Sequence, residues 1–282
     1  MKLCWYGEDR LGLVQGDEVL DVTAALAALP PARYPGPLGD ALVVHLDAVR
    51  DEVERAKGPA ARHPLAGVQL RSPVARPSKI IGVPVNYGDH VAEARSATGT
   101  FKQYEGGIEE QGLFLKATSS LVGSSEGVQV HFPQRPTHHE IELAVVIGKS
   151  GKNIDRAQAF NYVAGYAVAL DMTVRGGEDR SFRKSIDTYS VLGPWLTTAD
   201  EVADPQRLAF ALRVNGELRQ QSTTANMIMG IAQQIAWAST FYTLLPGDVI
   251  MTGTCEGVGP VRPGDVIDAE IQDLGSMRVK VR

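Results

Sequence analysis

From residue 79 to the C-terminus the chain consists of short apolar or alternating segments, each bounded by glycine, proline or asparagine. Such segments predict β-strands, and the Asn215-Gly216 pair between two of them predicts a hairpin. A helical pattern over residues 224–243 is the only long one in this part, so strands and helices do not alternate as in a doubly wound sheet or a TIM barrel. We therefore expect an α+β fold that is predominantly β. The predicted strands are 80–83, 127–131, 142–147, 162–170, 208–214, 248–252 and 266–271.

The first 72 residues differ from the rest and predict a small β/α unit. Short apolar runs separated by turn residues indicate an antiparallel meander, and residues 41–57 repeat their apolar side chains on a helical period. A proline-containing connector follows. We predict two domains, a small N-terminal domain at 1–72 and a larger one at 73–282. The predicted strands of the meander are 3–6, 11–14 and 19–22.

Charge and composition exclude several classes of protein. The 282 residues carry a net charge of −5 and no basic stripe, so we expect no nucleic-acid partner. No apolar run is long enough to span a membrane, and the acidic start of the chain is unlike a signal peptide. We expect a cytoplasmic protein in which Cys4 and Cys255 are reduced thiols.

Three acids form the first chemical signal. On a strand, Glu140 and Glu142 point to the same face about 7 Å apart. Burying two such carboxylates without partners is costly, so either that face is solvated or a cation lies between them. Asp171 follows another apolar run, where an acid is a candidate ligand but also a common turn or cap residue. Together the three oxygen donors suit a hard cation such as Mg²⁺.

Histidines near these acids leave a second interpretation open. His138 and His139 could join the acids around a transition metal, although two surface imidazoles on a loop are the favoured alternative. Farther upstream, His90 and Glu93 are three residues apart and become neighbours on a helical turn beginning near Asp89. A carboxylate that orients an imidazole can make it a general base for water, whereas the simpler interpretation is a histidine on a helix surface. The polar, glycine-rich residues that follow predict a lid over 90–112.

Together these motifs resemble the fumarylacetoacetate hydrolase family, from about Lys79 to Met277. Each motif alone is weak, but their order and spacing are specific. The matching motifs are Gly82…Asn86-Tyr87…His90…Glu93, Phe114…Lys116, the block 140–148, Asp171-Met172-Thr173, Lys184-Ser185-Ile186-Asp187-Thr188, Leu192-Gly193-Pro194-Trp195, Asn215-Gly216-Glu217, and 246–254 followed by Gly257-Val258-Gly259.

The resemblance implies a fold, an assembly and residue roles. The implied fold is a mixed β-sandwich roll with a small N-terminal domain, assembled as a homodimer. The implied residue roles fall on four sets of residues. Glu140, Glu142 and Asp171 would bind Mg²⁺ or Mn²⁺, His90 and Glu93 would form a water-activating dyad on the lid, Lys184 would contact substrate at the metal, and Gly253 with Thr254 would bind the substrate carboxylate or oxo group.

The implied activity is hydrolysis of a C–C bond in a small 2-oxo (β-diketo) acid such as an acylpyruvate, through a metal-stabilised enolate, in aromatic catabolism. Two alternatives within the family are an oxaloacetate-type decarboxylase and a 2-hydroxyhepta-2,4-diene-1,7-dioate or 5-carboxymethyl-2-hydroxymuconate isomerase. A binding protein with a vestigial metal site is the alternative of another class.

The chain departs from the family pattern at three places. The stretch 172–183 is shorter than in many relatives, Cys255-Glu256 replaces a more usual Pro-Ala, and His139 stands where an acid or small polar residue is common. The resemblance therefore gives no substrate contacts for 172–183.

Overall fold

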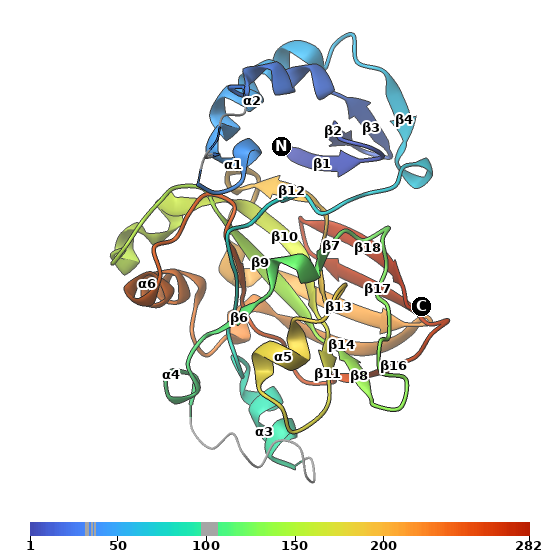
Figure 1. Cartoon of the computed structure of the whole chain (residues 1–282), viewed down its shortest axis with the longest axis vertical. Helices are drawn as coiled ribbons and strands as arrows, with labels where there is room; N and C mark the ends of the chain where they lie inside the picture. Colours follow the sequence, from blue (N-terminus) through green and yellow to red (C-terminus); the bar gives the residue numbers. More distant parts are fainter. Residues whose placement is uncertain (32–33, 35, 37, 97–106) are drawn as a thin grey trace.

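The computed structural model describes residues 1–31, 34, 36, 38–96 and 107–282, with only the backbone for 94–96. The α+β, predominantly β fold is confirmed (Figure 1). The middle of the expected lid lies outside the described residues. No helix among the described residues is long and apolar enough to cross a membrane.

One 11-stranded sheet runs through the whole molecule. Its strands are β1 (Lys2–Tyr6), β2 (Arg10–Gln15), β3 (Glu18–Asp21), β4 (Arg62–Pro64), β5 (Ile80–Gly82), β6 (Phe114–Lys116), β7 (Leu121–Val122), β9 (Ile141–Ile147), β10 (Val163–Asp171), β12 (Ser190–Thr198) and β15 (Val249–Met251). The order is β4-β3-β2-β1-β12-β10-β9-β15-β5-β6, with β7 paired to β12. The central strand β9 is buried along its whole length.

Two smaller sheets complete the β structure. The first contains β8 (Thr137–His139), β11 (Thr173–Val174) and β16 (Gly259–Val261), and the second contains β13 (Ala209–Val214), β14 (Glu217–Thr223), β17 (Val266–Ile271) and β18 (Gly275–Lys280). The predicted hairpin at Asn215-Gly216 is confirmed by the pairing of β13 with β14. The predicted strand 127–131 is wrong as a strand, because Val128 makes only an isolated bridge, to Val281.

The N-terminal meander forms as expected, with its helical residues packed over it (Figure 1). The predicted helix 41–57 is divided into α1 (Ala41–Val44) and α2 (Leu46–Ala56), because the backbone of His45 leaves the helical region. Strand β1 pairs with β12, so the meander continues the main sheet. The domain boundary at residue 72 stays a prediction.

The other helices are short. They are α3 (Gly88–Ser96), α4 (Ile108–Gln111), α5 (Arg180–Lys184) and α6 (Ile231–Phe241), with 3-10 turns η1 (Thr23–Ala28), η2 (Leu65–Gly67), η3 (Thr118–Ser120), η4 (Arg156–Tyr162), η5 (Ala199–Glu201), η6 (Pro205–Arg207) and η7 (Thr224–Asn226). The predicted helix 224–243 begins too early. Asn86 accepts a hydrogen bond from the N–H of Met229 and donates one to its carbonyl, and this holds the chain extended before Gly230 caps α6.

Alternation along β9 separates two apolar cores. Leu143 and Val145 face one core, whereas Ala144 and Val146 face the other, which also contains the helices of the N-terminal part. Because side chains alternate along a strand, Glu142 projects from the same face as Ala144. The side chain of Glu142 therefore lies on the face of β9 that also packs against the N-terminal helices.

Candidate metal centre and active site

Three carboxylates meet at the end of the central strands. Glu142 lies on β9, Glu140 just before it, and Asp171 ends β10. The two strands are antiparallel, and the N–H of Asp171 donates to the carbonyl of Glu140, so the register places the three acids together. Each offers a ligand atom within 4.8 Å of the others, and their residues are only 5%, 3% and 1% exposed. Three buried oxygen donors at this spacing could hold a hard divalent cation.

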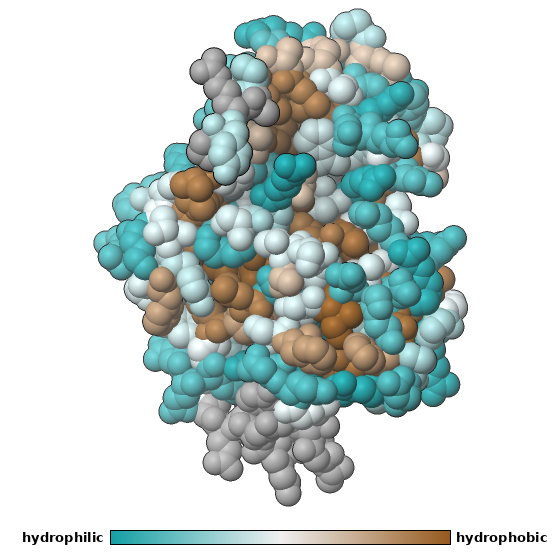
Figure 2. Space-filling model, in the orientation of Figure 1, coloured by the Kyte–Doolittle hydropathy of each residue, from teal (hydrophilic) through white to brown (hydrophobic). Residues whose placement is uncertain are grey.

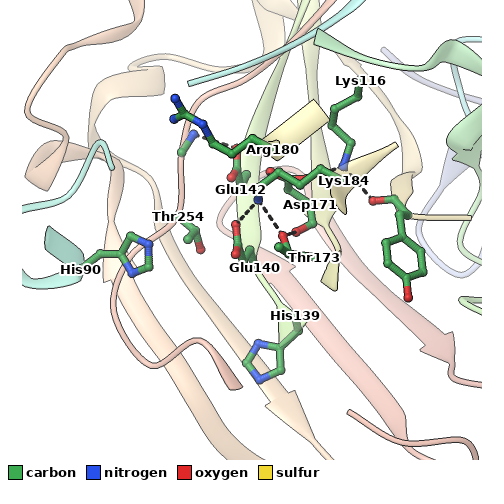
Figure 3. Close-up of polar contacts among 12 residues, drawn as sticks. His90, Lys116, His139, Glu140, Glu142, Asp171, Thr173, Arg180, Lys184 and Thr254 are labelled. Atoms are coloured by element: carbon green, nitrogen blue, oxygen red, sulfur yellow. Dashed lines mark hydrogen bonds and ion pairs between the residues drawn. The ribbon is translucent and has the colours of Figure 1, made fainter. Parts of the chain in front are cut away.

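Two lysines flank Asp171. The ammonium of Lys184 donates to Glu140 (2.7 Å), Asp171 (2.6 Å) and the hydroxyl of Thr173 (2.6 Å). Lys116 forms an ion pair with the other oxygen of Asp171 and donates to the carbonyl of Tyr189 (2.9 Å). Figure 3 shows the two lysines approaching Asp171 from different elements, α5 and β6.

The pKa values of the two lysines are shifted in opposite directions. Burial lowers the pKa of Lys184, but the carboxylates of Asp171 and Glu140 outweigh it, so this pKa is raised. Burial also lowers the pKa of Lys116, where the attraction of Asp171 does not overcome burial and repulsion from Lys184. Lys184 is therefore the firmly charged member of the pair.

The pKa values of Glu140 and Glu142 are also shifted in opposite directions. Burial raises the pKa of Glu140, but Lys184 and Arg175 oppose it and hold the pKa well below its usual range. Arg175 donates to Oε1 of Glu140 at 3.0 Å, whereas Lys184 donates to Oε2. Burial together with the charge of Asp171 raises the pKa of Glu142 well above its usual value. Of the three acids, Glu142 is thus the one whose negative charge is least compensated by nearby positive charge.

Glu142 is the acid that a bound cation would satisfy. In the described part of the chain, no Lys, Arg or His forms an ion pair with it, and its one hydrogen-bond donor there is the N–H of Gly253 (2.7 Å). A buried carboxylate without a counter-charge is costly. The remaining lone pairs of the three acids fit a divalent ion with oxygen ligands.

The predicted His–Glu pair is present on α3. The Nδ1 of His90 lies 3.1 Å from Glu93, whose second oxygen accepts the N–H of Gly257 at 3.1 Å. Burial raises the pKa of Glu93, but the hydrogen bonds with His90 and Gly257 outweigh burial, so the pKa is lowered overall and the carboxylate is ionised. An ionised Glu93 accepts the Nδ1–H of His90 and leaves Nε2 as the basic nitrogen. Figure 3 places the His90 ring on the same side of the acids as Thr254.

Gly253 and Thr254 contribute through the backbone. Gly253 has a φ of +96°, and a Cβ there would lie 2.6 Å from the Cβ of Asn86, so only glycine suits this position. Its N–H orients Glu142. The hydroxyl of Thr254 donates to the carbonyl of Ile141 (2.7 Å) and accepts from Gln220 (2.8 Å). The side chain is therefore engaged in holding β9, which leaves the backbone N–H as its donor for a ligand.

Of the two neighbouring histidines, His139 is buried and His138 is half-buried. The expectation of surface imidazoles is wrong, because both histidines lie on β8 and His139 is fully buried against Gln220 (3.0 Å). Burial and the charge of Arg175 lower the pKa of His138 to about 4. Cys4 and Cys255 are free thiols, as expected; both are buried, and burial raises the pKa of each thiol to about 12.

Sequence reasoning assigned no role to three residues of this site. Lys116 was part of a motif, but an isolated lysine gives no sign that it will be buried. Arg175 lies in the stretch whose contacts the family pattern leaves open, and Gln220 lies on a strand of another sheet. The sequence signal that could have pointed to Lys116 is its two-residue spacing from Phe114, which places both side chains on one face of β6.

Comparisons with known proteins identify the family of the chain. The profile of the family described as fumarylacetoacetate (FAA) hydrolase C-terminal matches residues 79–282. The chain is 50% identical over 288 residues to a maleylpyruvate hydrolase of Aquipseudomonas alcaligenes, an alignment that covers 100% of this chain and 99% of that protein. It is 38% identical over 230 residues to a mitochondrial oxaloacetate tautomerase of Rattus norvegicus, covering 77% of this chain and 71% of that one.

A solved structure of similar fold contains a metal and a 2-oxo acid. The fold superimposes with a TM-score of 0.84 on a maleylpyruvate hydrolase from Sphingobium sp. SYK-6 in complex with manganese(II) and pyruvate. The two chains are 42% identical, and the match covers 100% of this chain and 98% of the other. A protein of this fold therefore binds both a divalent metal and a 2-oxo acid.

Proposed function

The chain belongs to the fumarylacetoacetate hydrolase family of enzymes, and we propose that it hydrolyses a C–C bond in a small β-diketo acid of the acylpyruvate type. Maleylpyruvate is the first candidate substrate, since similarity to maleylpyruvate hydrolases extends over the whole chain. The observation that carries the proposal is the buried triad of acids next to an intact His90–Glu93 pair.

Glu140, Glu142 and Asp171 would hold the metal, Mn²⁺ or Mg²⁺. Manganese in a relative of the same fold supports Mn²⁺, and the all-oxygen donor set suits either ion. When bound, the ion supplies Lewis-acid polarisation of a 2-oxo acid held by its carboxylate and oxo oxygens. The adjoining N–H of Gly253 keeps Glu142 oriented toward it.

His90 acts on water in this proposal. Its Nε2 removes a proton from a water molecule while Glu93 holds Nδ1–H, and the water oxygen attacks the distal carbonyl carbon. The C–C bond on the pyruvate side of that carbon breaks, and its electron pair remains with the pyruvate fragment. The distal carbonyl carbon becomes a carboxylate, and a proton returned to the pyruvate methylene carbon completes the reaction.

Lys184 and Thr254 would stabilise the negative charge of the substrate. The ammonium of Lys184 is buried and firmly charged, so it can offset charge that develops on the 2-oxo oxygen. Its three hydrogen bonds to protein groups must then be shared with substrate. The backbone N–H of Thr254 is the donor proposed for the substrate carboxylate.

We also propose a cytoplasmic homodimer, as the family resemblance implies. Exposed apolar side chains support a partner surface. Leu115 of β6 and Phe182 of α5 are exposed, and Figure 2 shows apolar residues on the face that carries these elements. Light scattering of the purified protein would give its mass; a monomer at all concentrations would contradict the dimer.

A substrate panel tests the function. Protein stripped with EDTA and reloaded with Mn²⁺ or Mg²⁺ is given maleylpyruvate, acetylpyruvate or oxaloacetate, and pyruvate release is followed by a coupled dehydrogenase. We expect metal-dependent release of pyruvate from the acylpyruvates and none without metal. Loss of enol oxaloacetate without acylpyruvate cleavage would instead support the tautomerase activity named for the rat relative. Absence of both activities would refute the proposal.

A further inference from the structure

The ring of Phe114 occupies a defined place beside the proposed catalytic lysine. Phe114 and Gly82 are directly paired residues on β6 and β5. The ring folds across Gly82 so closely that a Cβ there would overlap it. Phe114 is 8% exposed, and Lys116 projects from the same face two residues later. Glycine at position 82 thus makes room for an aromatic ring on the wall of the site.

Two cations lie over this ring. The Nζ of Lys184 and the guanidinium carbon of Arg180 are each 5.5 Å from its centroid. The two residues are one helical turn apart, so they share the side of α5 that faces β6. An aromatic face attracts a cation within about 6 Å, and more strongly where water is excluded. The ring therefore lies within cation–π distance of Lys184, whose three N–H groups also donate to Glu140, Asp171 and Thr173.

Helix α5 depends on such contacts for its position. It has five residues, too few for a helix to be stable by itself. Asp179 caps its first turn through the N–H of Ser181 (2.7 Å), and the hydroxyl of Ser181 donates to the carbonyl of Leu115 on β6 (2.7 Å). Strand β6 thus supports α5 at one end by a hydrogen bond and along its inner side by the Phe114 ring.

We propose that Phe114 is a positioning residue whose ring holds the ammonium of Lys184 beside Glu140 and Asp171 through a cation–π contact. This inference rests on the role of Lys184 in the proposed function. Arg180 shares the ring and donates to the carbonyl (2.8 Å) and side chain (3.2 Å) of Gln111 on α4. The ring therefore contacts α5 directly and is linked to α4 through Arg180.

Two kinds of variant separate the ring's electrostatics from its packing. Phe114→Leu removes the π face but keeps an apolar side chain. Phenylalanines with one, two or three ring fluorines at position 114 keep the shape and weaken the attraction for cations stepwise. The matched control places the same fluorinated residues at Phe210, a buried ring that packs edge-on against Tyr87.

Binding of oxalate to the Mn²⁺-loaded protein is measured by calorimetry, together with kcat and KM for acylpyruvate hydrolysis. Oxalate probes the site without reaction. We expect Phe114→Leu to raise the oxalate Kd and to lower kcat by about 10-fold each, and KM to change less. Each added fluorine at position 114 should weaken oxalate binding further, whereas fluorination of Phe210 should leave it unchanged.

Several results would overturn the inference. Unchanged oxalate affinity and kcat in all Phe114 variants would remove the role of the ring. An effect of leucine without any effect of fluorine would reduce the role to packing. If leucine prevents folding, the fluorinated series alone decides. Oxalate binding that follows the fluorine series in a protein that hydrolyses no acylpyruvate would refute the proposed function but leave the positioning role intact.

Discussion

Replacing Glu142 by glutamine should stabilise the metal-free protein and remove most of its stabilisation by metal. Glutamine keeps the size of the side chain and an oxygen that can accept the N–H of Gly253. It removes a charge that is buried beside Asp171 and Glu140. The variant therefore separates the cost of this charge in the empty site from its value as a ligand.

The sign of the effect follows from the raised pKa of Glu142. A carboxyl whose pKa is higher in the folded than in the unfolded protein binds its proton more tightly when folded. Its contribution to stability is complete below the unfolded pKa of about 4.3 and is lost as the pH rises toward the folded pKa. The loss is about 1.4 kcal/mol per pH unit. In EDTA, the stability of Glu142→Gln relative to wild type should therefore increase as the pH rises above about 5 toward the folded pKa.

With metal bound, the wild type should become more stable than Glu142→Gln. With free Mn²⁺ at about 100 times its Kd, the wild type should gain about 2.7 kcal/mol of unfolding free energy. For a protein near this size, 1 kcal/mol corresponds to roughly 2–4 °C, so its Tm should rise by about 5 °C or more. Glutamine is a weak ligand, and the variant should gain less than about 1 kcal/mol at the same Mn²⁺.

Thermal unfolding in EDTA and in Mn²⁺ measures both effects. The matched control is Glu178→Gln, which removes an acid that is 44% exposed in its pair with Arg135 and lies outside the triad. The control should keep the full response to Mn²⁺. The reasoning would be refuted by a variant that keeps this response, or by one that is less stable than wild type in EDTA at the higher pH.

Three further substitutions test other parts of the site. His90→Ala should keep its Mn²⁺ affinity and lower kcat for hydrolysis by about 10²–10⁴-fold, because a general base is lost. Lys116→Met should lower the unfolding free energy in EDTA by about 3 kcal/mol, since it breaks a buried ion pair with Asp171, and by less with Mn²⁺ bound. Gly253→Ala should cost about 1–3 kcal/mol because of its positive φ and the clash with Asn86, and should weaken Mn²⁺ binding.

Controls of the same chemical type accompany these variants. They are His45→Ala, the exposed Lys149→Met, and Gly177→Ala, where a Cβ would meet nothing within 4 Å. Each should behave like wild type in its assay. Undiminished hydrolysis by His90→Ala, equal stability of Lys116→Met and wild type in EDTA, or normal Mn²⁺ affinity in Gly253→Ala would each contradict the corresponding assignment.

Local patterns were reliable where neighbours in sequence are also neighbours in space. Glu140 and Glu142 project from one face because the strand repeats every two residues, and His90 meets Glu93 because a helix turns every three to four. The hairpin at Asn215 depends on turn residues alone. Each of these features is contained in a few consecutive residues.

Local patterns were wrong where a distant group competes for the backbone. The apolar period from 224 onward is helical, yet Ile228 is 57% exposed and precedes the helix. Asn86, more than a hundred positions earlier in the chain, binds the backbone at Met229 and keeps this stretch out of the α-helix. A side chain from another element thus replaced the hydrogen bonds that a helix would have formed.

The sequence by itself determined that two acids share a strand face, that a histidine and a glutamate share a helical turn, and that the fold is rich in strands. The family resemblance added Asp171 to these acids, but only the tertiary structure showed how it reaches them, through the register of β9 against β10. It also decided which cations surround the acids, since Lys116 comes from β6 and Lys184 from α5. Periodicity reports the direction of a side chain within its own element, whereas the charges that it meets depend on long-range pairing and burial.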